Sequence, residues 1–262
     1  MNKTTETKNR GPIVVKIGGS TLGEEDTTLQ DVVALHKRGE QVIVVHGGGA
    51  MINDWLHRLN VPSIFIDGLR ETNEEALEVV VAILRGILNT HFVAAIAQLG
   101  GRAIGLSGVD SALIQARQLD QQLGFVGEVT AIDTSALHLV LEAEAIPVIA
   151  PIGIEASGQP LNINADAVAG EVARAVDASW LIFLSDVDGV LDRNGKLLKE
   201  LNTASATALR QNGTLTDGMI PKIEAALRTA QHGTSVHIIN GRVPHTLEQT
   251  ISGNVIGTRI GG

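Results

Sequence analysis

The hydrophobic positions of the chain fall into short runs separated by longer amphipathic stretches. Several runs are apolar at consecutive positions and rich in valine and isoleucine, which is typical of strands covered on both faces of a parallel sheet. The predicted strands are Ile13–Ile17, Val42–Val45, Ala103–Leu106, Pro147–Ala150, Leu181–Leu184 and Val236–Ile239. The stretches between them repeat their apolar residues with helical spacing. The predicted helices are Leu29–Arg38, Met51–Leu59, Glu74–Leu99, Ser135–Ala143, Ala165–Val176, Ala204–Gln211 and Met219–Gln231. This alternation predicts a three-layer α/β/α sandwich around a mainly parallel sheet.

Two segments interrupt the alternation and have the pattern of hairpins. In Gln118–Asp133 two glycines separate apolar residues, and Val190–Glu200 has Asn194-Gly195 at its centre, a favoured pair for a tight turn. Two helices are followed by a glycine, Gly39 and Gly233, where a left-handed residue is expected to end the helix. We place a boundary between two lobes near Val176–Ser179.

Composition narrows the classes of function. The net charge of -9 leaves no basic surface to attract nucleic acid, and the aromatic content of 2% with no tyrosine argues against base-stacking platforms. With no cysteine in the chain, disulfides, thiolate metal sites and cysteine nucleophiles are excluded. Residues 1–11 are polar and are interpreted as a loose tail rather than a signal peptide. No uninterrupted run of about 18 apolar residues is present, so we expect a cytoplasmic protein without a membrane span.

Two glycine clusters follow predicted strands. The first strand ends in Lys16-Ile17-Gly18-Gly19-Ser20 and the second in His46-Gly47-Gly48-Gly49. Loops at the carboxyl ends of parallel strands form the ligand crevice of open α/β sheets, and glycine lets backbone N–H groups approach phosphoryl oxygens. Either cluster alone is equally consistent with a tight turn. We interpret His46 as a packing and hydrogen-bonding residue. Neither cluster matches the common nucleotide-binding motifs.

Four later segments carry polar groups, and the first two segments each have two interpretations. Asn162 and Asn164 precede a helix that has Asp166 in its first turn, so they either cap the helix or bind a polar substrate group. The segment Leu184–Gly189 is either a phosphate- or metal-binding turn or a simple Asx-turn. Lys222 lies near the start of a helix, where a cation opposes the helix dipole, which favours an anionic partner. Arg70 is assigned to carboxylate recognition because its planar fork binds two oxygens at once.

Taken together, these motifs resemble one known family. Lys-x-Gly-Gly, His-Gly-Gly-Gly, Gly-Leu-Arg-x-Thr, Asn-x-Asn-Ala-Asp, Leu-Ser-Asp-Val-x-Gly, Thr-Asp-Gly-Met-x-x-Lys and a terminal Gly-Thr-Arg occur here in the order found in the N-acetylglutamate kinases, within the amino-acid kinase superfamily. The resemblance covers Pro12 to Ile260. It implies the amino-acid kinase fold, with residues 1–177 forming a lobe for acyl-amino-acid binding and dimerisation and residues 178–262 forming an ATP-binding lobe.

The resemblance also implies roles for individual residues. Lys16 and Lys222 neutralise the transferring γ-phosphoryl group, and Asp166 holds both lysines. The acyl-amino-acid site uses Gly47, Gly48, Arg70 and Asn162, together with Asn164. Phosphate and ATP binding falls to Gly18, Gly19, Ser185, Asp186, Val187, Asp188, Gly189, Thr216, Asp217, Gly218 and Met219.

The implied reaction transfers the ATP γ-phosphoryl group to the side-chain carboxylate of N-acetyl-L-glutamate in arginine biosynthesis. A carboxylate needs no general base, and Mg²⁺ is held mainly by nucleotide phosphates and water, so we assign no protein metal ligand. The apolar helix Glu74–Leu99 corresponds to the dimer contact of the family, so a homodimer is expected. Two alternatives stay open: a kinase for carrier-protein-linked aminoadipate or glutamate, and a non-catalytic amino-acid or nucleotide sensor of the same fold.

Overall fold

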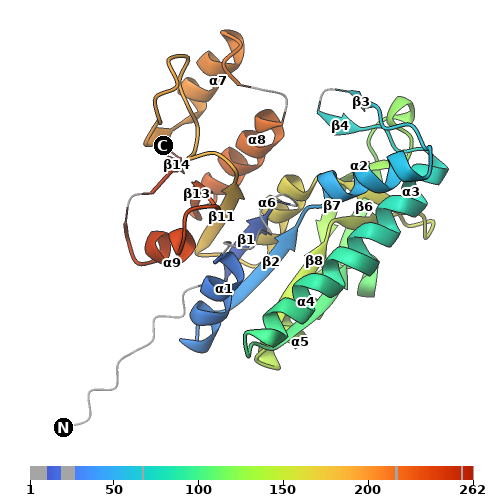
Figure 1. The fold of residues 1–262 in the computed structure, drawn as a ribbon, viewed down its shortest axis with the longest axis horizontal. Helices are drawn as coiled ribbons and strands as arrows, with labels where there is room; N and C mark the ends of the chain where they lie inside the picture. Colours follow the sequence, from blue (N-terminus) through green and yellow to red (C-terminus); the bar gives the residue numbers. More distant parts are fainter. Residues whose placement is uncertain (1–10, 19–26, 67, 216–217, 255, 262) are drawn as a thin grey trace.

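A computed structural model of the chain describes residues 11–18, 27–66, 68–215, 218–254 and 256–261. Eight strands form one central sheet in the order β12-β14-β13-β11-β1-β2-β8-β5 (Figure 1). All neighbouring pairs in it are parallel except β13 and β14. Because β1 pairs with β2 on one side and with β11 on the other, the sheet is continuous from the first half of the chain to the second.

The elements have the following bounds. The strands of the central sheet are β1 (Ile13–Ile17), β2 (Val42–His46), β5 (Ala103–Ser107), β8 (Ile146–Ala150), β11 (Trp180–Ser185), β12 (Glu200–Leu201), β13 (Ser235–Asn240) and β14 (Thr258–Ile260). The remaining strands are β3 (Phe65–Ile66), β4 (Leu69–Arg70), β6 (Ile114–Gln118), β7 (Val126–Ile132), β9 (Ile152–Ile154) and β10 (Pro160–Ile163). The α-helices are α1 (Thr28–Lys37), α2 (Gly49–Arg58), α3 (Glu74–Val81), α4 (Asn89–Gln98), α5 (Ser135–Glu142), α6 (Ala165–Ala175), α7 (Thr203–Gln211), α8 (Met219–Ala230) and α9 (Thr246–Ile251).

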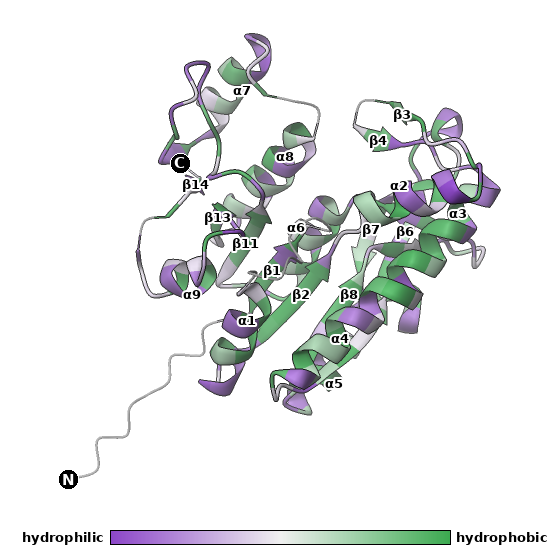
Figure 2. Ribbon diagram, in the orientation of Figure 1, coloured by the Kyte–Doolittle hydropathy of each residue, from purple (hydrophilic) through white to green (hydrophobic). Residues whose placement is uncertain are grey.

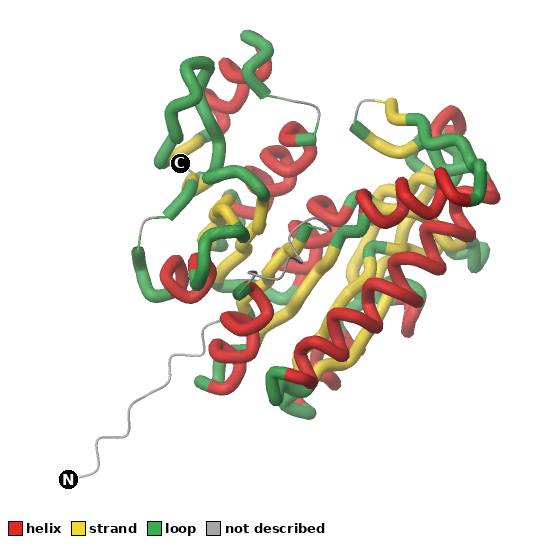
Figure 3. The backbone as a smooth tube through the Cα atoms, in the orientation of Figure 1, coloured by secondary structure: helices red, strands yellow, loops and turns green. Residues whose placement is uncertain are grey.

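Successive residues of the central strands face two separate cores. Val14 of β1 packs in the core that α5, α6 and α8 cover, whereas Ile13 and Val15 pack in the core under α1, α4 and α9. Both faces of the sheet are therefore buried, which explains the consecutive apolar residues in its strands. Figure 3 shows the strands lying between helices, and in Figure 2 the central strands β1, β2 and β8 have mainly the hydrophobic colour. The predicted three-layer α/β/α sandwich with a mainly parallel sheet is confirmed.

All six predicted strands and all seven predicted helices are present, and their ends agree with the predicted ends to within two residues. Gly39 and Gly233 have the positive φ angles expected after a helix, +89° and +88°. The first predicted hairpin exists as the antiparallel pair β6 and β7, but it begins at Ile114 rather than at Gln118. The second is smaller than predicted, because the chain around Asn194-Gly195 makes a turn closed by a single antiparallel bridge from Leu191 to Leu197.

The predicted helix Glu74–Leu99 is a composite of α3, a π-helical segment (Ala82–Leu88) and α4. By length and composition Glu74–Gln98 could cross a membrane, and 44% of its most apolar 18-residue window is buried within the protein. Its inner residues pack in the fold: Phe92 and Ile96 lie in the core under α1, and Leu84 and Leu88 pack against α2. A core helix of a soluble protein shows the same composition, so this finding does not alter the interpretation of the helix as a packing element.

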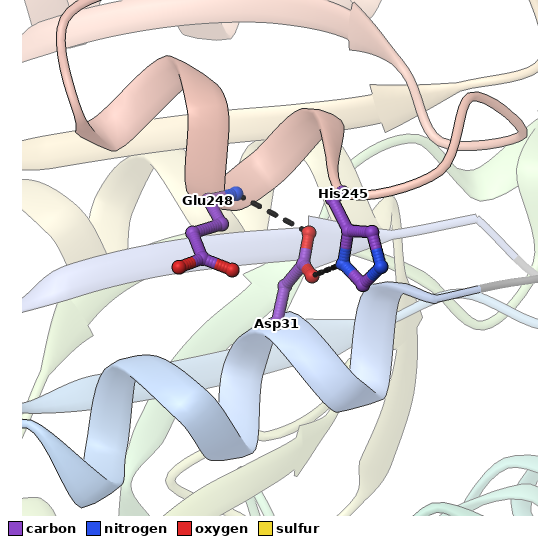
Figure 4. Close-up of side chains that lie close together, drawn as sticks. All are labelled: Asp31, His245 and Glu248. Carbon is purple, nitrogen blue, oxygen red and sulfur yellow. Dashed lines mark hydrogen bonds and ion pairs between the residues drawn. The ribbon is translucent and has the colours of Figure 1, made fainter.

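A buried carboxylate joins the beginning of the chain to its end. Asp31 of α1 is 1% exposed; its Oδ1 accepts a hydrogen bond from Nδ1 of His245 (2.7 Å) and its Oδ2 one from the backbone N–H of Glu248 (3.2 Å) (Figure 4). Potential metal-ligand atoms of these three residues lie within 4.8 Å of one another. Both Asp31 oxygens already have donors, however, and Glu248 pairs with Arg38 at 2.8 Å. We interpret these hydrogen bonds as a structural contact that holds α9 against α1.

Candidate active site

A buried group of three charged side chains lies where β1, α6 and α8 meet. Lys16 follows three apolar residues of β1, Asp166 is in the first turn of α6, and Lys222 is in the first turn of α8. Asp166 Oδ1 lies 2.8 Å from Lys16 Nζ and 2.9 Å from Lys222 Nζ, and Asp166 Oδ2 lies 3.1 Å from Lys222 Nζ. All three residues are less than 9% exposed. The structure thus brings together the three residues that the family resemblance predicted to lie in one group.

This group has two basic side chains but only one acidic side chain. Burial raises the pKa of Asp166, but the two lysines outweigh it and hold this pKa at about 2. Burial lowers the pKa of Lys222 to about 8, with Lys16 adding to the decrease and Asp166 opposing it. With both lysines protonated, two buried cations share one carboxylate. Buried charge that lacks a counter-ion is costly, so the group is suited to an anionic ligand.

Local structure sets the position of each member. Asn164 caps α6, because its Oδ1 accepts from the backbone N–H groups of Asp166 and Ala167 (2.9 and 3.2 Å). The capping interpretation of Asn164 is therefore confirmed, and the residue also lines the cavity described next. The Lys222 ammonium lies over the ring of Phe183 at 5.3 Å from its centroid, an arrangement that favours a cation at the start of α8.

The first cavity lies between the carboxyl ends of β1 and β2 and the segment that carries Arg70. It contains all the residues predicted to bind an acyl amino acid. Its polar lining consists of Lys16, Gly47, Gly48, Gly49, Gly68, Arg70, Asn162, Asn164 and Asp166. Its apolar lining includes Ile52, Phe65, Leu69, Leu84, Val126 and Pro151.

Arg70 is held by neutral groups on several sides. Its guanidinium donates to Asn53 Oδ1 (2.7 Å), to Ser63 Oγ and to the carbonyl of Gly49 (3.4 Å). It also lies over the ring of Phe65, 4.6 Å from the centroid. Burial lowers the pKa of Arg70, and no carboxylate of the described residues pairs with it. A buried, oriented guanidinium without a carboxylate partner is suited to bind a carboxylate ligand.

A second chain of hydrogen bonds connects Arg70 to Asn162. The Thr72 hydroxyl donates to the carbonyl of Arg70 (2.9 Å) and accepts from Nδ2 of Asn162 (3.0 Å), and Thr72 is fully buried. These bonds link β4 to β10 and fix the position of Arg70 relative to Asn162, the two candidates for substrate binding. Thr72 belongs to the Gly-Leu-Arg-x-Thr motif but had no predicted role of its own.

A second cavity adjoins the first. Its lining consists of Lys16, Gly18, Asp166, Leu184, Ser185, Asp186, Val187, Gly218, Met219 and Lys222. Lys16 and Asp166 line both cavities. The two spaces therefore meet at the charged group, with Arg70, the residue predicted to bind a carboxylate, in one and several of the residues predicted for nucleotide binding in the other.

Some predicted ATP-binding residues lie elsewhere. Asp188 is exposed and accepts a hydrogen bond from Nδ2 of Asn240 (2.8 Å), and Gly189 is buried against Thr258, where a Cβ atom would come within 2.6 Å of the hydroxyl oxygen. Neither lines the second cavity, because the turn after Val187 leads away from it towards β14. Gly19, Thr216 and Asp217 lie outside the described residues.

Sequence reasoning missed the residues that support Arg70. Asn53 is on the second turn of α2, and Ser63 and Phe65 are in the segment that precedes β4. No motif marks these positions. The one available signal was their place in the sequence, between the second glycine cluster and Arg70, which puts them near the cavity only once the fold is known.

Comparisons with known proteins agree with this geometry. A family model described as the amino acid kinase family matches residues 11–240. An acetylglutamate kinase from Campylobacter curvus is 44% identical over 257 residues, which is 95% of this chain and 91% of the relative. An acetylglutamate kinase from Dehalococcoides mccartyi is 37% identical, with 95% and 94% of the two chains covered. The solved structure of smu.665 from Streptococcus mutans matches with a TM-score of 0.84 and 32% identity, covering 95% of this chain and 98% of that one.

Proposed function

The chain belongs to the amino acid kinase family, and from this premise we propose that it is an acetylglutamate kinase that phosphorylates the side-chain carboxylate of N-acetyl-L-glutamate with ATP. One observation carries the proposal: the cavity with Arg70 and the cavity with Lys222 meet at Lys16 and Asp166. A phosphoryl donor in one cavity and a carboxylate acceptor in the other would react beside two buried cations.

The residues support a mechanism of positioning and charge stabilisation. Arg70 binds one carboxylate of the acceptor and thereby directs the other carboxylate towards Lys16. The acceptor oxygen is already ionised at neutral pH, so no side chain has to remove a proton. As the phosphoryl group transfers, its negative oxygens lie near Lys16, Lys222 and the Gly48 N–H, groups whose positions the fold sets in advance. The sites of donor and acceptor are adjacent, which makes the reaction effectively intramolecular.

ATP and Mg²⁺ fit the second cavity. Its excess of buried positive charge favours an anionic ligand such as the phosphates of ATP, and the backbone at Gly18 and Gly218 lines it without bulky side chains. Mg²⁺ would neutralise charge on the phosphates and keep most of its ligands from phosphate and water. Ser185 and Asp186 also line this cavity and are placed to interact with the nucleotide or its hydrated metal.

The test is a hydroxylamine-trapped acyl-phosphate assay with ATP and Mg²⁺. We expect hydroxamate from N-acetylglutamate and much less from glutamate, aminoadipate or N-acetylaspartate. Glutamate and aminoadipate lack the acyl group, and the side chains of aminoadipate and N-acetylaspartate are one methylene longer and one shorter than that of N-acetylglutamate. Hydroxamate formed equally from all four acids would contradict the assignment of substrate. Absence of product from every free acid would direct attention to a carrier-linked acceptor or a sensor.

We expect Arg70→Lys to weaken binding of the acid substrate selectively. Lysine keeps the charge but cannot make the bidentate contact or the bonds to Asn53 and Gly49. The KM for N-acetylglutamate should rise roughly 10- to 100-fold, as expected for a loss of about 1.4 to 3 kcal/mol in a charged hydrogen bond. The KM for ATP should change little. Arg193→Lys, at an exposed position, is the matched control. Equal increases in both KM values would argue against a role confined to the acid.

We also propose that the protein is a homodimer through its composite helix. On the outer side of this helix Ala82, Gly86, Thr90 and Ala94 are exposed at spacings of four residues, so a second helix can approach closely. Light scattering at micromolar concentration should give twice the mass of one chain. Gly86→Glu, which places a charge in the centre of this face, should shift the protein towards monomer, whereas Ala208→Glu on exposed α7 should not. A monomeric wild type would refute the proposal.

A further inference from the structure

The mechanism above makes no use of His46, a fully buried histidine at the end of β2. Its exposed fraction is 0%, and its ring stacks on the buried Phe92 with 5.0 Å between centroids. The side chain therefore cannot touch a substrate. It does, however, come directly before the glycine loop that lines the first cavity.

Both ring nitrogens of His46 have partners that specify where the proton lies. Nδ1 is 3.1 Å from the carbonyl oxygen of Gly47, which can only accept a hydrogen bond, so Nδ1 carries the hydrogen. Nε2 is 3.1 Å from Nδ2 of Asn89 and accepts from it. The Asn89 amide is itself oriented, since its Nδ2 donates to the carbonyl of Val148 (2.9 Å) and its Oδ1 accepts from Arg85 (3.2 Å).

The ring stays neutral at working pH. Burial lowers the pKa of His46 to about 4, and the hydrogen bond to Gly47 only partly opposes this decrease. A protonated ring would also direct an Nε2 hydrogen at the amide hydrogens of Asn89. Only the Nδ1-protonated neutral tautomer satisfies both contacts.

The bond to the Gly47 carbonyl determines the direction of the next N–H group. In a planar trans peptide the carbonyl of Gly47 and the N–H of Gly48 point to opposite sides. With the carbonyl directed at the buried His46 ring, the Gly48 N–H is directed away from it, and no described residue accepts a hydrogen bond from it. Gly48 lines the cavity beside Lys16.

The π-helical segment packs against the same peptide. A Cβ atom on Gly48 would come within 2.6 Å of a Leu88 methyl group and 2.7 Å of a Leu84 methyl group. Asn89 begins α4 immediately after this segment. The widened helical turn thus presents two leucines to the glycine loop and an amide to His46, and π-helical turns are frequent at functional sites.

We propose that His46 is a positioning residue: with Asn89 behind it, it holds the Gly47–Gly48 peptide so that the Gly48 N–H points at the transferring phosphoryl group. The inference rests on the proposed kinase function. It gives the histidine of the His-Gly-Gly-Gly motif a role in catalysis without contact to substrate.

The tautomer can be measured in the wild-type protein. In ¹⁵N-histidine-labelled protein at pH 7, long-range nitrogen–proton spectra should show that Nδ1 of His46 is protonated and that Nε2 is unprotonated. The His46→Asn variant assigns the signal by its disappearance. An Nε2-protonated or a charged ring would overturn the proposal, because Nδ1 of the former could not donate to Gly47 and the latter contradicts the contact with Asn89.

Two substitutions separate positioning from packing. In His46→Asn the amide occupies the place of Nδ1 and can still donate to Gly47, whereas in His46→Gln it reaches the place of Nε2. Both lose the ring that stacks on Phe92, so both should unfold at similarly reduced temperatures. We expect the Asn variant to stay near wild-type kcat and the Gln variant to lose roughly 10²-fold, as misplaced catalytic groups do. Equal kcat values for the two variants would overturn the proposal.

Ligand binding gives a readout that packing alone would not change. By calorimetry the Gln variant should bind MgADP like wild type but should bind MgADP with aluminium fluoride and N-acetylglutamate, a mimic of the transferring phosphoryl group, at least about tenfold more weakly. Unchanged affinity for the mimic would count against the proposal. If wild type itself neither turns over N-acetylglutamate nor binds the mimic, the proposed function has failed rather than the role of His46.

Discussion

Asp166→Asn is expected to reduce kcat about 10³-fold and to lower the free energy of unfolding by about 3 kcal/mol. The substitution conserves shape but removes the carboxylate between Lys16 and Lys222, whose ammonium groups are 2.8 and 2.9 Å from Asp166 Oδ1. Two buried cations then face each other without a counter-charge and move apart, so neither lies where the phosphoryl group needs it. Initial rates in the hydroxamate assay and urea denaturation measure the two effects.

Asp177→Asn is the matched control for this experiment. Asp177 is exposed, its φ is 48°, and asparagine tolerates that left-handed conformation well. We expect this variant to match wild type in rate and in stability. A kcat for Asp166→Asn within tenfold of wild type would contradict the role assigned to the carboxylate.

Lys222→Ala is expected to lower kcat by about 10³-fold while the KM for N-acetylglutamate changes little. In the proposed mechanism the ammonium stabilises the negative charge of the transferring phosphoryl group, and Lys222 lines the second cavity rather than the first cavity, which contains Arg70. Lys196→Ala, at an exposed turn, should leave kcat unchanged. A loss confined to the KM for the acid would place Lys222 in substrate recognition instead.

The same lysine predicts the alkaline limb of the pH profile. Burial lowers the pKa of Lys222 to about 8 in the free enzyme, so the side chain is charged below that pH and neutral above it. The value of kcat/KM, which reports free-enzyme groups, should therefore fall as the pH rises through about 8. Bound phosphate favours the charged form, so the fall in kcat should come at higher pH. The limb should be absent in Lys222→Arg, whose guanidinium does not titrate there.

The layers of the fold were predictable from the sequence because each strand and helix has its own pattern of apolar residues. The strands β1, β2 and β8 are buried at every position, and continuous apolar runs between helical patterns indicate such strands directly. The strands β9 and β10 were missed. They are short, contain glycine or proline, and are stable because they pair with each other and with β6 and β7 rather than through their own pattern.

The grouping of Lys16, Asp166 and Lys222 was predictable because each belongs to a recognisable motif, and the structure confirms that the three side chains meet. The position of side chains was not predictable where neighbours in a turn diverge: Val187 lines the second cavity, while Asp188 and Gly189 pack towards Asn240 and Thr258. The π-helical turn was also invisible, because the apolar residues of Glu74–Leu99 keep a helical repeat through it. The contacts of Arg70 depend on the approach of α2 to β4, which no spacing in the sequence specifies.

The single carboxylate shared by Lys16 and Lys222 has a consequence for the lifetime of the protein. A folded state that confines surplus positive charge is less stable than it would be with matched charges, and any polyanion that fills the site relieves the repulsion. By mass action, a nucleotide that binds the folded state then raises the melting temperature, and the increase grows with the logarithm of its free concentration above its Kd. Proteolytic turnover of the protein should therefore slow when a nucleotide that fills the site is abundant.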